Sequence, residues 1–254
     1  MNAKVWLVGA GPGDPELLTL KAVRALKEAE VVMLDDLVNP AVLEHCPQAR
    51  VIRVGKRGGC RSTPQAFIQR LMLRHARQGR CVVRLKGGDP CIFGRGGEEA
   101  DWLAERGVEV ELVNGITAGL AGATRCGIPL TLRGVSRGVT LVTAHTQDDS
   151  EPNWQGLAQS GMTLVVYMGV ARLKAIQQGL LAAGMAVDMP VAMIENASLP
   201  GQRECRSQLG RMDVDAANFE LKSPAILVIG EVAGVASSVL PLNEQELQAI
   251  SCKS

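Results

Sequence analysis

The chain has 254 residues, of which 46% are hydrophobic and 21% charged, with a formal net charge of +1. This length is sufficient for one large domain or for two modest domains with separate cores, and the composition is that of a globular protein. The balanced charge and an aromatic content of only 3% argue against nucleic-acid binding, which needs a basic surface or aromatic stacking platforms.

Cysteine and histidine usage argues against a metal site. None of the 7 cysteines stands in a C-x-x-C pair, and the 3 histidines lack the spacing of zinc ligands. No apolar run approaches the roughly 20 residues of a membrane span, and the N-terminus runs into a strand without a targeting pattern. We therefore expect a cytoplasmic protein with reduced thiols, no metal and no membrane association.

The first half of the chain predicts strands that alternate with helices. The strands are expected at 4–9, 30–35, 51–55, 81–89 and 108–115. Three helices are expected. The first begins with Asp14 as N-cap and Pro15 at the first helical position, the second begins at 62–64, and the third begins at 96. Strands separated by helices predict a parallel sheet whose active surface lies at the carboxyl ends of the strands. The loops GAGPGD, LDD, VGKRGG, KGGDP and NGITAG are expected to converge there.

The second half has a different pattern. Strands are expected at 138–145, 162–169, 189–196 and 223–232, with a helix at about 171–184 and a further strand or hairpin in 201–212. The glycine-rich stretch that begins at NGITAG separates the two patterns. We therefore predict an N-terminal α/β domain over 1–115, a C-terminal α/β domain over 116–240 and a polar tail over 241–254.

The turn Gly9-Ala10-Gly11-Pro12-Gly13-Asp14 follows the first strand. It resembles a dinucleotide-binding turn, but the G-x-G-x-x-G spacing is missing and Pro12 removes an N–H that a phosphate would use. A structural turn and a phosphate site are equally compatible with this stretch alone. Asp35, at the end of the second strand, stands where a dehydrogenase places its ribose-binding carboxylate, so a nicotinamide-dependent oxidoreductase is one alternative.

The stretch RLKGGDPCIFGRGGEEADWL, residues 84–103, is more specific. The two glycines before Asp89 let the backbone approach a ligand, and the Asp89 carboxylate can accept hydrogen bonds from a ribose or an amine. Arg95 stands between glycines, which predicts a loop side chain that points outward. Glu98 and Glu99 open the next helix, where the helix dipole favours acidic residues, so one of them can serve only to stabilise the first turn.

Cations accumulate near the predicted loops. Lys56 follows the third strand, where a solvated loop lysine is the ordinary interpretation. A basic rim suited to carboxylates is predicted from five side chains, Lys86, Arg95, Arg125, Arg133 and Arg137. Met168 and Ala197 stand at the ends of two strands of the second half, where the backbone can contact a ligand.

Taken together, GAGPGDPELLTLKA, VVMLDDLV, VGKRGG, VRLKGGDPCIFGRGGEE, NGITAG, GIPLTLR, YMG and MPVAMIEN resemble the tetrapyrrole methylase family. The resemblance extends to about residue 235, and KGGDP-x-IFGRGGEE is its most specific part. It implies two α/β domains with the active site in the cleft between them, and a homodimer. It also implies an S-adenosylmethionine-dependent C-methyltransferase that methylates uroporphyrinogen III at C2 and C7, via precorrin-1, to precorrin-2 for sirohaem, cobalamin or haem d1.

The resemblance also implies roles for individual residues. The residues implied to contact the methyl donor, and its product S-adenosylhomocysteine, are Pro12, Gly87, Gly88, Asp89, Ile92, Thr117, Ala118, Met168 and Ala197. Family members often have glycine at the position of Ala197. The implied catalytic residues are Asp35 as proton acceptor, Lys56 as proton donor, and Arg133. The substrate is expected to contact Arg95, Glu98, Arg133 and Met168. Because arginine has a pKa above about 12, we expect Arg133 to act electrostatically.

Two other functions stay open beside the oxidoreductase at this point. One is methylation of a different tetrapyrrole, such as a precorrin, and the other is a non-enzymatic tetrapyrrole or nucleotide carrier.

Overall fold

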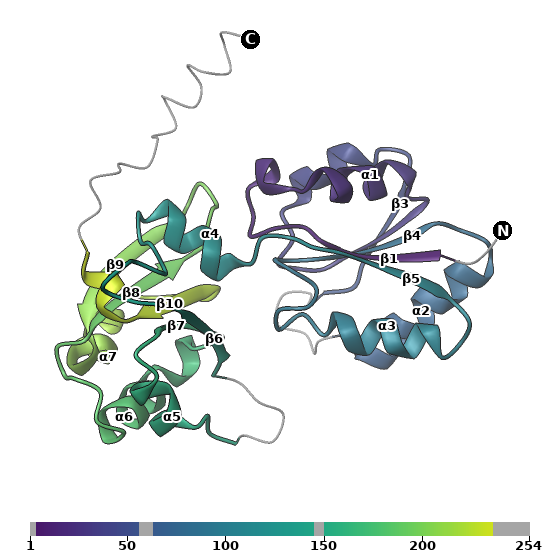
Figure 1. The fold of residues 1–254 in the computed structure, drawn as a ribbon. Helices are drawn as coiled ribbons and strands as arrows, with labels where there is room; N and C mark the ends of the chain where they lie inside the picture. The colour runs from purple at the N-terminus through teal and green to yellow at the C-terminus, as the bar shows by residue number, and fades with distance from the viewer. Residues whose placement is uncertain (1–3, 56–62, 145–149, 236–254) are drawn as a thin grey trace, which may run out of the picture. The chain divides into compact units, whose positions relative to one another are not determined.

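A computed structural model describes residues 4–55, 63–144 and 150–235. The chain divides into two compact units, Met1–Ala118 and Gly119–Ser254 (Figure 1). Each unit is built on its own five-stranded sheet. The fold class is α/β with two α/β domains, as the sequence predicts.

The N-terminal unit contains a parallel sheet with the strand order β3-β2-β4-β1-β5. Its strands are β1 (Lys4–Gly9), β2 (Val31–Leu34), β3 (Arg50–Arg53), β4 (Val82–Lys86) and β5 (Glu109–Val113). Strands β1, β2 and β4 are almost entirely buried, because helices cover both faces of the sheet. All five carboxyl ends lie at one edge, so the loops that follow them meet there.

The helical segments of this unit are η1 (Pro15–Leu17), α1 (Leu20–Glu28), η2 (Pro40–His45), α2 (Gln65–Arg77) and α3 (Gly96–Ala104). α1 covers one face of the sheet, and α2 and α3 cover the other (Figure 1). Each face has its own aliphatic core: Leu26 of α1 belongs to one cluster, and Met72 of α2 and Leu103 of α3 belong to the second.

The first helix does not begin where the sequence predicts. Asp14 accepts a hydrogen bond from the backbone N–H of Glu16 at 2.9 Å, but it caps only the short 3-10 turn η1. Leu18 then adopts an extended conformation, which ends the turn. The α-helix begins at Leu20, with the Thr19 hydroxyl accepting from the Ala22 N–H at 3.1 Å. The sequence therefore contains two successive caps, and the second one starts the helix.

The C-terminal unit has a mixed sheet with the order β6-β7-β10-β8-β9. Its strands are β6 (Val139–Thr143), β7 (Thr163–Tyr167), β8 (Pro190–Glu195), β9 (Arg203–Gln208) and β10 (Ala225–Ile229). β6 and β7 are parallel, and the other neighbours are antiparallel. The segment 201–212 thus supplies an edge strand, β9, paired with β8. Because β10 runs against both β7 and β8, the carboxyl ends of β6, β7 and β8 share one edge.

The helical segments of this unit are α4 (Ala118–Arg125), α5 (Trp154–Gln159), η3 (Val170–Arg172), α6 (Leu173–Ala182), η4 (Leu209–Arg211), α7 (Met212–Asn218) and η5 (Glu231–Gly234). Leu180 of α6 and Met212 of α7 are fully buried in the aliphatic core of the unit. None of the helices in the described parts of the chain combines the length and the apolar character of a membrane span.

Candidate functional site

Four glycines bring three loops of the N-terminal unit into close contact. Gly11, in the loop after β1, and Gly88, in the loop after β4, exchange backbone hydrogen bonds of 3.2 and 2.7 Å. A Cβ on Gly9 would lie 2.6 Å from the Gly88 carbonyl oxygen and 2.5 Å from the Gly115 nitrogen. The loops can approach this closely only because no side chain intervenes. The result is a wall of bare backbone at the carboxyl edge of the sheet.

Asp89 connects two of these loops. One carboxylate oxygen accepts from the Cys91 N–H at 2.7 Å, and the other accepts from the Gly115 N–H at 3.1 Å and the Asn114 side chain at 3.3 Å. The residue is only 7% exposed. The side chain of Asp89 therefore holds the loops after β4 and β5 together. Any ligand contact at this position is left mainly to the backbone.

The remaining predicted cofactor residues of this unit lie in the same loops. Pro12 stands between Gly11 and Gly13, both of which have positive φ. Gly87 approaches Leu37 so closely that a Cβ would lie 2.9 Å from the Leu37 Cβ. Ile92 and Thr117 stand in the loops after β4 and β5, and Ala118 follows Thr117 as the first residue of α4. Thr117 is buried, with its Cα 3.7 Å from where a Cβ on Gly88 would lie.

Asp35 is at the same edge, directly after β2. One of its oxygens accepts from the Arg84 guanidinium at 2.9 Å, and the other accepts from the Asp36 N–H at 2.9 Å. Its side chain remains 33% exposed. Lys56, the other residue with a predicted proton-transfer role, lies outside the described residues.

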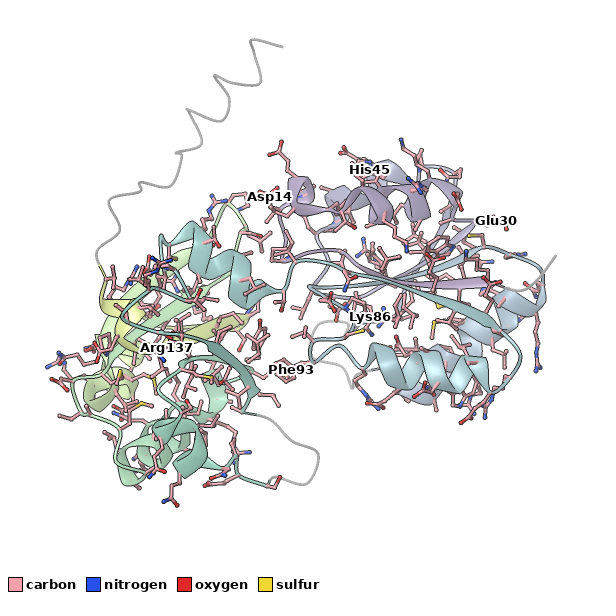
Figure 2. The ribbon with its side chains drawn as sticks, viewed as in Figure 1. Asp14, Glu30, His45, Lys86, Phe93 and Arg137 are labelled. Atoms are coloured by element: carbon pink, nitrogen blue, oxygen red, sulfur yellow. The ribbon has the colours of Figure 1, made fainter. Side chains whose placement is uncertain are left out.

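Lys86 does not belong to a basic rim, contrary to the prediction. It is 4% exposed and its ammonium group lies 3.1 Å from the carboxylate of Glu99, on the side of the sheet that α3 covers (Figure 2). Burial lowers the pKa of Lys86, with a further contribution from the nearby Arg84. The lysine continues a buried strand, so its side chain points into the protein instead of into the loop.

Glu99 has a larger role than stabilising the first turn of α3. It is fully buried and contacts Lys86, the Arg84 guanidinium at 3.5 Å and the Gln65 side chain at 2.7 Å. Sequence reasoning did not identify this group or Arg84. The available signal was the i, i+2 spacing of two cations on a strand that is otherwise apolar, because such cations share one buried face and need a carboxylate there.

Arg95 and Glu98 form an exposed ion pair at the start of α3. The Arg95 Nε lies 3.0 and 3.1 Å from the two Glu98 oxygens. The hydrogen bond raises the pKa of Arg95 and lowers that of Glu98. Arg95 has φ +58° between Gly94 and Gly96, so the loop turns sharply and presents the side chain outward, as predicted.

The arginines of the C-terminal unit are in different environments. Arg133 is exposed on a tight hairpin in which Leu132 and Ser136 exchange backbone hydrogen bonds of 3.0 and 2.9 Å. Arg137, labelled in Figure 2, is also exposed. Arg125 is half-buried and donates to the Ser198 carbonyl at 3.5 Å. Arg133 and Arg137 therefore remain available to an anionic ligand, whereas Arg125 has a contact within the protein.

Met168 and Ala197 lie at the shared carboxyl edge of the second sheet, after β7 and β8. Met168 is 50% exposed and has φ +55°. Ala197 is buried against α4, where a Cβ on Gly122 would lie 3.0 Å from the Ala197 Cβ. It stands between Asn196 and Ser198, which also have positive φ.

Backbone strain gathers in the predicted site loops. Among the described residues, six non-glycine residues have positive φ: Phe93, Arg95, Met168, Asn196, Ser198 and Glu220. All except Glu220 lie in the loops after β4, β7 and β8. Left-handed conformations cost non-glycine residues about 1–3 kcal/mol and concentrate at ligand sites. The residues with positive φ therefore lie in the same loops that the sequence motifs predict as the site, and backbone conformation is an observation independent of those motifs.

The described residues contain no group of three or more histidine, cysteine or acidic side chains placed to hold a metal. The sequence model of the Tetrapyrrole (Corrin/Porphyrin) Methylases matches residues 4–213. The chain belongs to the tetrapyrrole methylases. Among these methylases, it is 79% identical over 232 residues to a uroporphyrinogen-III C-methyltransferase of Pseudomonas aeruginosa, covering 91% of this chain and 95% of that protein.

Solved structures of other tetrapyrrole methylases have the same fold. A uroporphyrin-III C-methyltransferase of Thermus thermophilus, complexed with S-adenosylhomocysteine, has a TM-score of 0.79 and 43% identity, covering 92% of this chain and all of that chain. A cobalt precorrin-4 methyltransferase has a TM-score of 0.81 at 27% identity, covering 91% of this chain and 96% of that chain. The chain is therefore more identical in sequence to the first of these proteins than to the second, whereas the two TM-scores are nearly equal.

Proposed function

We propose that this tetrapyrrole methylase transfers methyl groups from S-adenosylmethionine to C2 and C7 of uroporphyrinogen III and so produces precorrin-2. The observation that carries the proposal is the 79% identity to a uroporphyrinogen-III C-methyltransferase over nearly the full length of both chains. The glycine wall at the edge of the first sheet supports it, because a methyl donor without phosphate needs close backbone contact and not a ring of free N–H groups.

The methyl donor is assigned to the loops of both units. In the N-terminal unit these are Pro12, Gly87, Gly88, Asp89, Ile92, Thr117 and Ala118, and in the C-terminal unit Met168 and Ala197. Carbonyl oxygens at strand ends are suitable neighbours for a positive sulfonium. The roles of individual side chains follow the family resemblance and are part of the proposal.

The substrate is assigned to Arg95, Glu98, Arg133 and Met168. Uroporphyrinogen III carries eight carboxylates, so exposed guanidinium groups suit it on a chain of nearly neutral charge. Arg95 exchanges part of its contact with Glu98 for a substrate carboxylate in this proposal. The net charge of +1 is then consistent with a local arginine group instead of a basic surface.

The chemistry requires positioning and proton removal. The pyrrole carbon attacks the sulfonium methyl, the methyl–sulfur bond breaks, and S-adenosylhomocysteine leaves as the neutral product. The macrocycle then carries the positive charge until it loses a proton. We assign the removal of that proton to the carboxylate of Asp35. Lys56 is assigned the donation of a proton at one position of the macrocycle while a second position loses one, so that each methyl transfer releases one proton in total, and Arg133 is an electrostatic contact.

The test is anaerobic incubation with methyl-labelled S-adenosylmethionine and uroporphyrinogen III, followed by mass spectrometry of the macrocycle. We expect two labelled methyl groups per macrocycle, and an unlabelled macrocycle would refute the proposal. Precorrin-2 offered in place of uroporphyrinogen III tests the alternative that the enzyme methylates a later tetrapyrrole, and we expect no label to enter it. Binding of NADH, followed by its fluorescence, tests the oxidoreductase alternative, for which we expect no change.

We also propose that the protein works as a homodimer, on the family resemblance alone. Sedimentation equilibrium distinguishes a 54 kDa dimer from the 27.0 kDa chain, and a monomer at all concentrations would contradict this part of the proposal.

A further inference from the structure

A buried group of charges lies behind Asp35. Arg84 and Lys86 are two residues apart on β4 and point to the same face of the sheet, where Glu99 of α3 meets both. Arg84 is 3% exposed, Lys86 4% and Glu99 0%. Asp35 is the only one of the four charged residues whose side chain reaches solvent to a substantial degree, at 33%.

The guanidinium of Arg84 is fixed on several sides. Its Nη1 donates to the carbonyl oxygens of Met33 at 3.4 Å and Leu85 at 3.3 Å, and its Nη2 donates to Asp35 at 2.9 Å. Its Nε faces Glu99 at 3.5 Å. With so little rotational freedom, Arg84 determines where one Asp35 oxygen lies. The Asp36 N–H holds the other oxygen.

Glu99 keeps the group electrically balanced. It lies between the two cations, with one oxygen toward Arg84 and the other 3.1 Å from the Lys86 ammonium. Gln65 of α2 donates to the first oxygen at 2.7 Å. Removing one partner from such a group leaves an uncompensated buried charge, which is more costly than the pair itself is favourable. Arg84 therefore stays in place because Glu99 compensates it.

A buried ion group of this kind is a poor way to stabilise a core, since apolar residues of similar volume serve as well or better. The group ends at a partly exposed carboxylate at the carboxyl edge of the sheet, beside the glycine wall. We propose that Arg84 and Glu99 are positioning residues for Asp35: Arg84 orients the Asp35 carboxylate for proton removal, and Glu99 holds Arg84 in place. This inference rests on the role of Asp35 in the proposed function.

The experiment is a double-mutant cycle on the full-length protein. Asp35→Asn, Arg84→Met and the double variant are compared by the rate of methyl incorporation, the KM for S-adenosylmethionine and the Kd of S-adenosylhomocysteine. We expect Arg84→Met to lower kcat at least tenfold, with KM and Kd changed less than about twofold. In the Asp35→Asn background, the same substitution should have almost no further effect on kcat, because it acts through Asp35.

Two conservative variants guard against the possibility that Arg84→Met lowers kcat only because the protein unfolds. Glu99→Gln is nearly isosteric, and Arg84→Lys keeps the charge; both should lower kcat, and Arg84→Lys should lose less than Arg84→Met. Lys4→Met, which removes an ion pair with Glu111 at the amino end of the same sheet, is the matched control and should keep the full kcat.

The outcomes distinguish the proposed role of Asp35 from the positioning role of Arg84 and Glu99. If Asp35→Asn leaves kcat unchanged, the assigned role of Asp35 fails, and this inference fails with it. If Asp35→Asn is slow but Arg84→Met lowers kcat by the same factor in both backgrounds, only the positioning role is overturned. Unchanged kcat in both Arg84→Met and Glu99→Gln overturns it as well.

Discussion

The glycine wall can be tested by adding a single methyl group. In Gly9→Ala the new Cβ lies 2.6 Å from the Gly88 carbonyl oxygen and 2.5 Å from the Gly115 nitrogen. Both neighbours are backbone atoms, so no side chain can rotate away. Ordinary van der Waals contact begins at 3.4 Å, so the loops after β1, β4 and β5 must separate by about 0.8 to 0.9 Å.

The displacement predicts both a binding and a stability effect. Forcing a methyl group into a packed site costs about 1–3 kcal/mol of folding free energy. A shift of about 1 Å in a substrate-positioning group can lower the rate about 100-fold. We therefore expect Gly9→Ala to lower kcat/KM for S-adenosylmethionine by one to two orders of magnitude and to weaken S-adenosylhomocysteine binding, measured by isothermal titration calorimetry.

Gly97→Ala is the matched control. Gly97 lies in the first turn of α3, and a Cβ there meets nothing within 4 Å. Alanine in a helix is favoured over glycine by about 0.5–1 kcal/mol, so this variant should be slightly more stable and bind S-adenosylhomocysteine normally. If Gly9→Ala binds as tightly as Gly97→Ala and unfolds at the same urea concentration, the three loops are not a tight junction and the reasoning is refuted.

Three further outcomes are expected. Tyr167→Phe removes the hydroxyl that accepts from the buried Gly119 N–H at 3.0 Å, so urea unfolding should show a loss of about 1–3 kcal/mol. Burial raises the pKa of the Cys126 thiol to about 12, so iodoacetamide at neutral pH should label the exposed Cys91 and leave Cys126 unlabelled in peptide mass spectra of the folded protein. Burial and nearby arginines lower the pKa of His75 below 6.5, so the unfolded chain binds a proton more readily than the folded chain. The free energy of unfolding should therefore fall as the pH drops through 6.5. His75→Gln should flatten this pH dependence in urea titrations carried out at a series of pH values.

The first sheet could be predicted from the sequence because each of its strands is marked locally. Apolar runs bounded by turn residues placed all five strands, and their alternation with helices indicated the parallel arrangement. The second sheet could be predicted only as a set of strands. β10 pairs between β7 and β8 and runs against both, and no local pattern identifies the partner or direction of a strand.

The bridging segment shows the same limit. The sequence predicts the glycine-rich stretch after β5 as a domain boundary and, in NGITAG, as a loop of the site, but it predicts no helix there, and the stretch contains the helix α4. Its glycines are needed for contacts with residues far away in the sequence. A Cβ on Gly122 would lie 3.0 Å from the Ala197 Cβ, and the N–H of Gly119 donates to the Tyr167 hydroxyl. Small residues at a helix–sheet contact look like loop formers when their partners are far away in the sequence.

Within the candidate site, glycine positions can be predicted from the sequence more readily than backbone strain or buried charges. The glycines that let loops approach one another are evident in the sequence because glycine is chosen for that property. Met168 and Asn196 adopt a left-handed backbone conformation although neither is a glycine, so only the structure reveals their strain. Lys86 and Glu99, 13 residues apart, are each ordinary surface residues by type and become a buried pair only when α3 covers β4. A site built on bare backbone can therefore be located from sequence, while the charges that orient its reactive groups require the fold.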